Sequence, residues 1–128
     1  FIADERMSLF ATKSFWEGFD ARGDTLRCVV VPRLPFGPVN DPVLEERRER
    51  DARWWEHYYL PSAVLELKQA AGRLIRSATD EGCLVLADAR LTGPKAYAAR
   101  FLEALPVREV ERLPAAEIGD AVRGRFGR

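Results

Sequence analysis

The sequence predicts an α/β fold in which helices cover a mostly parallel sheet. Two continuous apolar runs, Cys28–Val31 and Cys83–Ala87, are typical of strands that are buried on both faces, as they are in parallel sheets. About fifty residues of mostly helical pattern separate these runs, which is long enough for the crossover that parallel strands require. The 128 residues are 47% hydrophobic with 20 basic and 20 acidic side chains, which favours one folded domain over a disordered chain.

The same composition excludes a membrane span, because the longest apolar stretches are far shorter than the ~20 residues that a span needs. The amino terminus lacks the pattern of a secretory signal, so we expect a cytoplasmic protein. The chain begins at Phe1 without an initiator Met, and three or four strands are few for a doubly wound domain. We therefore expect an incomplete fragment that lacks the first strands of its sheet.

Three strands are predicted along the chain. Ser8–Thr12 is expected to form a short first strand. Leu26–Val31 is a stronger second strand and ends at Pro32, because proline has no amide proton to donate to a ladder. Cys83–Ala87 is the third strand and ends at Asp88.

Between the second and third strands we expect two helices. Asp41 is placed to cap the first helix, and Pro42 takes its first position. This helix is expected to continue through the aromatic run Trp54–Tyr59. The second helix has Pro61 in its first turn and runs to about Ser77.

Helical pattern returns after the third strand. It covers Lys95–Leu105, and a further short helix begins within Leu113–Glu117. The tail Arg123–Arg128 is expected to be frayed. There is no internal repeat and no low-complexity segment, so the elements belong to one domain.

Cys28, Cys83 and His57 are the soft metal-ligand candidates of the chain. A structural zinc or iron–sulfur site needs about four such ligands, so no metal site is predicted. Each cysteine lies in or beside an apolar run and is read as a small buried hydrophobe. His57 is read as a helix-surface or interface residue.

A polar stripe is predicted on the second crossover helix. At 100° per residue, Gln69, Arg73 and Arg76 fall on one face, and Gly72 flanks them. A glycine inside a helix costs about 1 kcal/mol against alanine, so we expect something to approach the backbone closely at Gly72. The opposite face is apolar and is expected to face the core; it consists of Leu67, Ala70, Ala71 and Leu74.

This stripe has two interpretations. Two guanidinium groups and an amide on one rigid face are suited to phosphate oxygens. Alternatively, the arginines form an ordinary salt-bridged surface, with Glu66 or Asp80 as partners. Spacing alone does not decide between them.

A second candidate segment, Ser14–Asp20, follows the first predicted strand. Ligands of open α/β sheets bind at the carboxyl ends of the strands. Glu17, Gly18 and Asp20 could there orient water, pair with an arginine or accept a hydrogen bond from a ribose hydroxyl. The alternative is a turn whose aromatic residues only pack against the domain.

Taken together, these segments resemble the carboxyl-terminal motor lobe of superfamily 2 helicases, in particular the DinG group and its XPD relatives. Ser14–Asp20 looks like helicase motif V, and Val29–Phe36 resembles the strand and loop that follow it. Tyr59–Leu91 looks like motif VI with its flanks, including Asp88-Ala89-Arg90 after the last strand. The resemblance covers roughly residues 8–106.

The resemblance implies a RecA-like second lobe over residues 1–128, with residues 112–128 as a short helix and tail. In such a lobe, Gln69, Arg73 and Arg76 would reach the γ-phosphate of ATP, with Arg76 as the arginine finger and Arg73 as its companion. ATP and Mg²⁺ would be held mainly by the first lobe, and no metal by this chain. The residues that would line the nucleotide cleft are Gly72, Glu17, Gly18 and Asp20.

The resemblance also implies a track for single-stranded DNA. Basic and aromatic side chains hold single strands through phosphate attraction and base stacking. The candidates near the strand ends are Lys13, Ser14, Phe15, Trp16 and Arg33. The aromatic run Trp54–Tyr59 is interpreted as helix packing, with DNA stacking as the alternative. The arginines of residues 47–53 are interpreted as a solvated helix face.

The sequence departs from a complete motor in two ways. It has no G-x-x-x-x-G-K-[ST] phosphate loop and no acidic box for Mg²⁺. We therefore expect a lobe that is silent without a first RecA-like lobe as its partner, and whose exposed sheet edge favours self-association. Two alternatives stay open: a non-catalytic binding module that keeps the helicase-lobe fold, and the lobe of a nuclease-fused helicase.

Overall fold

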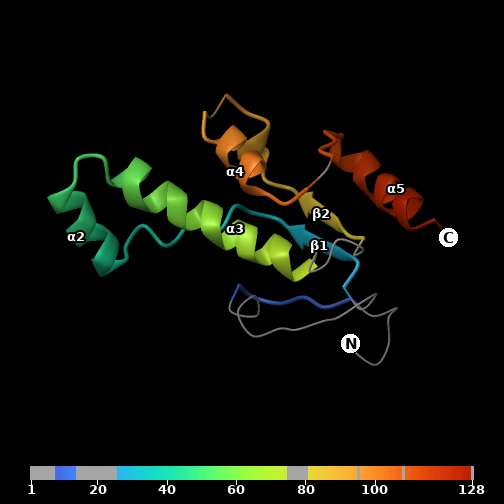
Figure 1. The fold of residues 1–128 in the computed structure, drawn as a ribbon, viewed down its shortest axis with the longest axis horizontal. Helices are drawn as coiled ribbons and strands as arrows, with labels where there is room; N and C mark the ends of the chain where they lie inside the picture. The colour runs from blue at the N-terminus through green and yellow to red at the C-terminus, as the bar shows by residue number, and fades with distance from the viewer. Residues whose placement is uncertain (1–7, 14–25, 75–80, 95, 108, 128) are drawn as a thin grey trace.

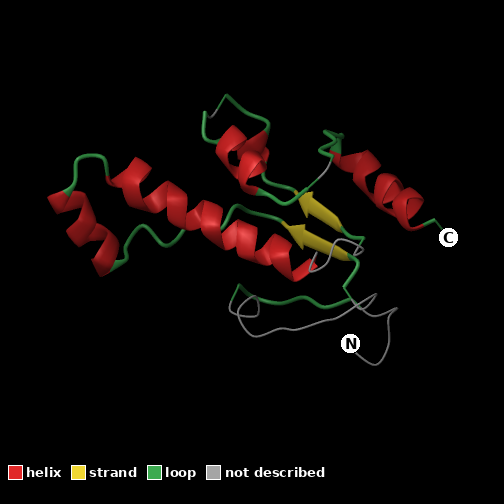
Figure 2. Ribbon diagram, viewed as in Figure 1, coloured by secondary structure: helices red, strands yellow, loops and turns green. Residues whose placement is uncertain are grey.

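The computed structural model describes residues 8–13, 26–74, 81–94, 96–107 and 109–127. Its centre is a parallel pair of strands, β1 (Cys28–Val31) and β2 (Cys83–Leu86), in which Cys28 lies opposite Cys83 and Val31 opposite Leu86 (Figure 1, Figure 2). Backbone hydrogen bonds extend the ladder at both ends, from Cys83 N to the Arg27 carbonyl (2.8 Å) and from Ala87 N to the Val31 carbonyl (3.0 Å). The predicted α/β class with parallel strands is confirmed.

The first predicted strand is wrong. Residues 8–12 have no regular secondary structure, and Phe10 is 97% exposed. A strand is stable only when a neighbouring strand pairs with its backbone groups, and in the described part of the chain the sheet contains β1 and β2 alone. An apolar run was therefore not sufficient to predict a strand here.

The crossover begins with α2 (Pro42–Arg50). As predicted, Pro42 opens the helix and the Asp41 carboxylate caps it, accepting a hydrogen bond from Val43 N at 2.8 Å. The helix is shorter than predicted because the chain turns extended at Asp51, where the carboxylate accepts from Arg53 N (2.8 Å).

The aromatic run therefore opens the second crossover helix instead of closing the first. A single π-helical turn, Trp55–Tyr59, leads directly into α3 (Leu60–Leu74), which follows the sheet in Figure 1. The predicted apolar face of α3 is confirmed: Leu67 is fully buried, and Ala70, Ala71 and Leu74 are at most 5% exposed. This face packs against both strands and against α4 (Ala98–Ala104).

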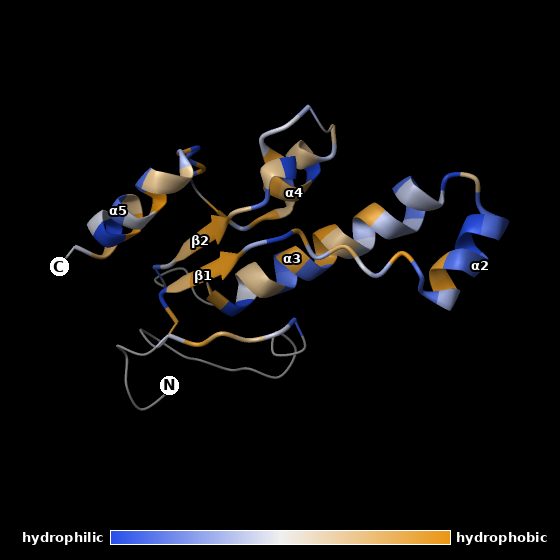
Figure 3. Ribbon diagram, turned by 180° about the vertical axis from the view of Figure 1, so that it is seen from behind, coloured by the Kyte–Doolittle hydropathy of each residue, from blue (hydrophilic) through white to orange (hydrophobic). Residues whose placement is uncertain are grey.

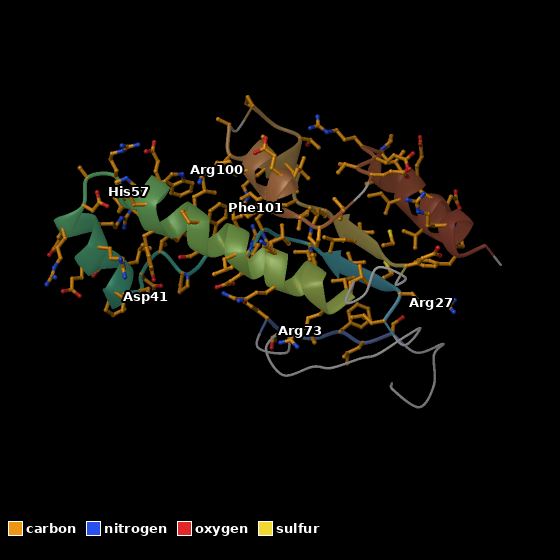
Figure 4. All side chains as sticks on the ribbon, in the orientation of Figure 1. Arg27, Asp41, His57, Arg73, Arg100 and Phe101 are labelled. Atoms are coloured by element: carbon orange, nitrogen blue, oxygen red, sulfur yellow. The ribbon has the colours of Figure 1, made fainter. Side chains whose placement is uncertain are left out.

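The core lies between one face of the sheet, α3 and α4. Phe101 of α4 is fully buried, and Figure 4 shows it on the side of α4 toward α3. Val29, Val31, Leu84 and Leu86 contribute the sheet side. Successive side chains of a strand alternate in direction, so the four remaining strand residues face the other way; they are Cys28, Val30, Cys83 and Val85. Figure 3 shows both strands as strongly hydrophobic.

The carboxyl-terminal third is helical, as predicted, with shifted boundaries. A 3₁₀ turn covers Ala89–Leu91, and α4 is shorter than the predicted Lys95–Leu105. The last helix, α5 (Ala115–Phe126), reaches well into the tail that was expected to be frayed. It ends at Gly127, whose φ of 64° is a left-handed conformation that favours glycine. None of the described helices is both long and apolar enough to cross a bilayer.

Candidate functional site

The two loops at the carboxyl ends of β1 and β2 are joined by one carboxylate. Asp88 Oδ2 accepts a hydrogen bond from Leu34 N at 2.7 Å, and Asp88 Oδ1 accepts one from Arg90 N at 3.0 Å. The Arg90 guanidinium donates to both carboxylate oxygens, with Nη2 2.6 Å from Oδ2 and Nε 3.0 Å from Oδ1. We call this arrangement of Leu34, Asp88 and Arg90 the Asp88 clamp.

Both charged groups of the clamp stay ionised. The hydrogen bonds from the Arg90 side chain, followed by those from the backbone amides of Leu34 and Arg90, hold the pKa of Asp88 well below its usual range. In turn, the Asp88 carboxylate raises the pKa of Arg90. The Asp88 side chain is only 7% exposed, so water reaches this ion pair mainly from the Arg90 side, which is 39% exposed.

An aromatic cluster supports the loop that follows β1. Phe36 stacks on Trp55 and Tyr59, with ring centroids 5.4 and 5.2 Å apart, and meets Phe101 edge-on at 5.6 Å. The Tyr59 hydroxyl donates to the Gly37 carbonyl at 2.6 Å. The loop is thus anchored at Leu34, Phe36 and Gly37.

Arg33, the DNA-contact candidate of this loop, is exposed beside the first of these anchors. A side chain on an anchored loop meets a ligand at lower entropic cost than one on a free loop. The motif Asp88-Ala89-Arg90 is part of the resemblance to helicase motif VI and its flanks, but no role was predicted for it. The sequence signal for the clamp was an aspartate followed two residues later by an arginine, directly after a predicted strand.

The polar stripe of α3 is described as far as Arg73. Gln69 and Gly72 are exposed, whereas Arg73 is half-buried and interacts with other residues of the chain. Figure 4 shows Arg73 on the side of α3 that faces residues 8–13. A Cβ atom at Gly72 would meet no described atom within 4 Å, so no described residue makes the close approach expected at this glycine.

Lys13 contacts the same helix. Its ammonium forms an ion pair with the Glu66 carboxylate on α3. Glu66, Gln69 and Arg73 are spaced three and seven residues apart, which places them on one side of the helix. The structure therefore brings one predicted DNA-contact residue to the stripe, and it gives Glu66 a lysine partner.

The remaining predicted site residues lie outside the described residues. These are Arg76, the proposed finger; Asp80; and the motif V segment with Ser14, Phe15, Trp16, Glu17, Gly18 and Asp20.

Residues 2–108 match the family model described as the helicase C-terminal domain. The chain belongs to the helicase C-terminal domain family. The match includes both strands, α3, α4 and the Asp88 clamp, and it stops before α5. It thus covers every predicted site residue.

Relatives of this helicase C-terminal domain include two proteins called ATP-dependent DNA helicase YoaA. The Escherichia coli protein is 46% identical over 110 residues, which is 83% of this chain, and the Haemophilus influenzae protein is 42% identical over 111 residues. The 3'-5' exonuclease DinG of Bacillus subtilis is 35% identical over 128 residues, 97% of this chain. The matched segments make up only 17%, 17% and 14% of these relatives.

The aromatic run of this helicase domain serves in packing, as predicted. Besides the contacts of Trp55 and Tyr59 with Phe36, two arginines of α2 cover its outer rings: Arg47 lies 3.9 Å from the Tyr58 centroid and Arg48 lies 4.5 Å from that of Trp54. His57 is exposed, as expected, with Nδ1 2.8 Å from Asp51 Oδ2. These contacts attach α2 to the start of α3.

Proposed function

We propose that this chain is the second motor lobe of a DinG-type ATP-dependent DNA helicase, catalytically silent without the first lobe. In this proposal it supplies Arg76 as the arginine finger, with Arg73 and Gln69 beside it. The observation that carries the proposal is the two-sided character of α3. Its apolar side is held in the core, while Gln69 and Gly72 are exposed and no described atom lies within 4 Å of a Cβ placed at Gly72.

ATP fits this face of α3. An amide and guanidinium groups donate hydrogen bonds to phosphate oxygens, and none of the described residues blocks the approach of an anion to the helix at Gly72. When bound, ATP supplies a phosphoryl group whose transfer concentrates negative charge on its oxygens. The described residues contain no group of three or more His, Cys, Asp or Glu side chains suited to a metal ion, and we assign Mg²⁺ to the first lobe.

In this proposal, the chain's own residues position the phosphates of ATP and stabilise the negative charge that develops on them. Packing of Leu67 and Ala71 fixes the helix, so the polar stripe moves with the lobe as a rigid unit. Arg73 is engaged within the chain, which suits a companion that supports the finger. Arg76 would complete the site only when the two lobes close, and such a finger accelerates turnover about a thousandfold or more.

The same proposal assigns a DNA track to the loops beside the stripe. Lys13, which is paired with Glu66 of α3, and Arg33 on the clamped loop would contact phosphates. Phe15 and Trp16 would stack on bases, with Ser14 preceding them in the track. With so few basic contacts we expect weak binding. Titration of labelled single-stranded DNA should show an affinity that falls only shallowly with salt. A steep dependence on salt would contradict this track.

The decisive experiment substitutes Arg76 in a polypeptide that joins this lobe to a first motor lobe. Arg76→Ala should lower DNA-stimulated ATP hydrolysis about a thousandfold, while a fluorescent ATP analogue still binds. Arg50→Ala is the matched control, because Arg50 is an exposed arginine paired with Glu46 on α2. Near-normal turnover by Arg76→Ala would remove the catalytic assignment.

A second candidate is the lobe of a nuclease-fused helicase. The Bacillus subtilis relative that matches 97% of this chain carries the name of an exonuclease. An exonuclease assay on the longer polypeptide, with Arg76→Ala included, separates the candidates, because the substitution should stop ATP hydrolysis and leave nuclease activity.

Self-association through a free sheet edge belongs to the same proposal. In the described part of the chain, each strand has a neighbour on one side only. Unpaired strand edges recruit further strands. Sedimentation of the 128-residue chain should therefore show concentration-dependent dimers, and a monomer at all concentrations would contradict this.

A further inference from the structure

Cys28 and Cys83 lie directly opposite each other on the two strands. They face away from the core, because Val29 and Leu84, the next residues along each strand, pack into it. Both cysteines are half-buried and reduced. The proposed helicase activity uses neither of them.

Their spacing is compatible with a covalent link. Neighbouring strands lie about 4.8 Å apart. Two cysteines can form a disulfide when their Cα atoms are roughly 4.4–6.8 Å apart. The two thiols are close enough to affect each other, since a hydrogen bond that the neutral Cys28 thiol donates to Cys83 is one of the causes that raise the pKa of Cys28. The backbone hydrogen bond from Cys83 N to the Arg27 carbonyl (2.8 Å) holds this register.

We propose that Cys28 and Cys83 form a redox-active dithiol that closes into a disulfide between β1 and β2 when a low-molecular-weight disulfide oxidises it. In the first step, the Cys83 thiolate attacks one sulfur of the small disulfide and releases one thiolate. In the second step, the Cys28 sulfur displaces the remaining small thiol from Cys83 and loses its proton. Two protein thiols are oxidised, and one small disulfide is reduced to two thiols.

The order of the steps follows from the environment of Cys28. Burial, and then the neighbouring Cys83, raise the pKa of Cys28 to about 11, so its thiol is rarely ionised at neutral pH. A poorly ionised thiol reacts slowly with a reagent in solution. It reacts more readily with a partner that is already in place, as Cys83 is in the second step.

The test exposes the folded, reduced 128-residue chain to oxidised glutathione and follows intact mass and free thiols. Free thiols should fall from two per chain to none, with a net loss of two hydrogen atoms and no retained glutathione. Digestion without reductant should give one peptide that links Cys28 to Cys83. In denaturant, the same treatment should leave glutathione adducts, because the unfolded chain does not hold the two sulfurs together.

Cys28→Ser and Cys83→Ser are the matched controls, and each should stop at a single glutathione adduct or stay reduced. The proposal is overturned if the folded wild-type chain keeps glutathione on either cysteine, forms only intermolecular disulfides, or retains both thiols. These readouts do not depend on ATP or DNA. Failure of the dithiol therefore leaves the helicase proposal standing, and the reverse also holds.

Discussion

At the scale of single residues, Asp88 links the loops that follow the two strands. Its carboxylate is the acceptor for a backbone amide of the β1 loop and for both the amide and the guanidinium of Arg90. This nearly buried carboxylate accepts hydrogen bonds from three donor groups. When it is removed, all three donors lose their acceptor. The energetic effect of a substitution therefore exceeds the value of one hydrogen bond.

Asp88→Asn should lower the free energy of unfolding by about 2 kcal/mol. The folded state holds the Asp88 pKa below its usual range, so the ionised clamp stabilises the protein above about pH 4 and loses that contribution as the pH falls. Urea unfolding at pH 7 and pH 3 checks both statements, because the variant should lose less stability than wild type on acidification. Asp120→Asn, at an exposed pair with Arg123, is the control and should change little. An equal loss on acidification in both proteins would contradict the role of the clamp.

Substitution of Gly82 tests how closely the turn before β2 packs against Leu74. A Cβ atom at this position would lie 2.5 Å from Leu74 Cγ, so Gly82→Ala should force Leu74 to move and destabilise the chain by about 1–3 kcal/mol. Gly124→Ala in α5 is the matched control, since its Cβ meets no described atom within 4 Å and the helix should gain about 0.5–1 kcal/mol. Thermal unfolding of both variants measures the contrast, and a neutral Gly82→Ala would contradict this packing.

At the scale of elements, the sequence predicted β1, β2, the Asp41 cap and the buried face of α3, because each depends on local pattern. Two features were not predictable in this way. The break at Asp51 arises where the chain turns extended after α2, although a helical pattern continues through it. The segment 8–12 has strand composition but lacks a paired neighbour in the described residues. The Asp88 clamp and the aromatic cluster likewise join positions that are distant along the chain.

Substitution of Phe101 tests which contacts hold α4 against α3. Its ring is fully buried and meets Phe36 edge-on, so Phe101→Ala should destabilise the chain by about 3–5 kcal/mol. Phe101→Leu, which keeps most of the volume, should recover more than half of this loss. Chemical unfolding followed by circular dichroism measures both variants. Equal stability of the two would show that the aromatic contacts, and not the filled volume, hold α4.

At the scale of the whole molecule, α5 contributes no fully buried residue to the core. The helicase family match ends at residue 108, and none of the residues of α5 is buried. Its Arg125 pairs with Glu109 at 3.1 Å, in an exposed contact of the kind that contributes at most about 1 kcal/mol. The cooperative core therefore lies within the helicase domain proper.

A chain that ends at residue 112 should accordingly unfold within about 4 °C of the full chain. Differential scanning calorimetry of both lengths makes the comparison, and the matched far-ultraviolet circular dichroism spectra should differ only by one helix. A much larger fall in the unfolding temperature would show that α5 is part of the cooperative unit.

If the chain is the proposed motor lobe, the Asp88 clamp would also have a mechanical role. Because the Asp88 carboxylate, which follows β2, holds the loop after β1 through Leu34 N, a load on the loop that carries Arg33 would be passed to β2. A motor transmits force only through stiff parts. The brace supplies that stiffness at the point where the proposed track meets the sheet.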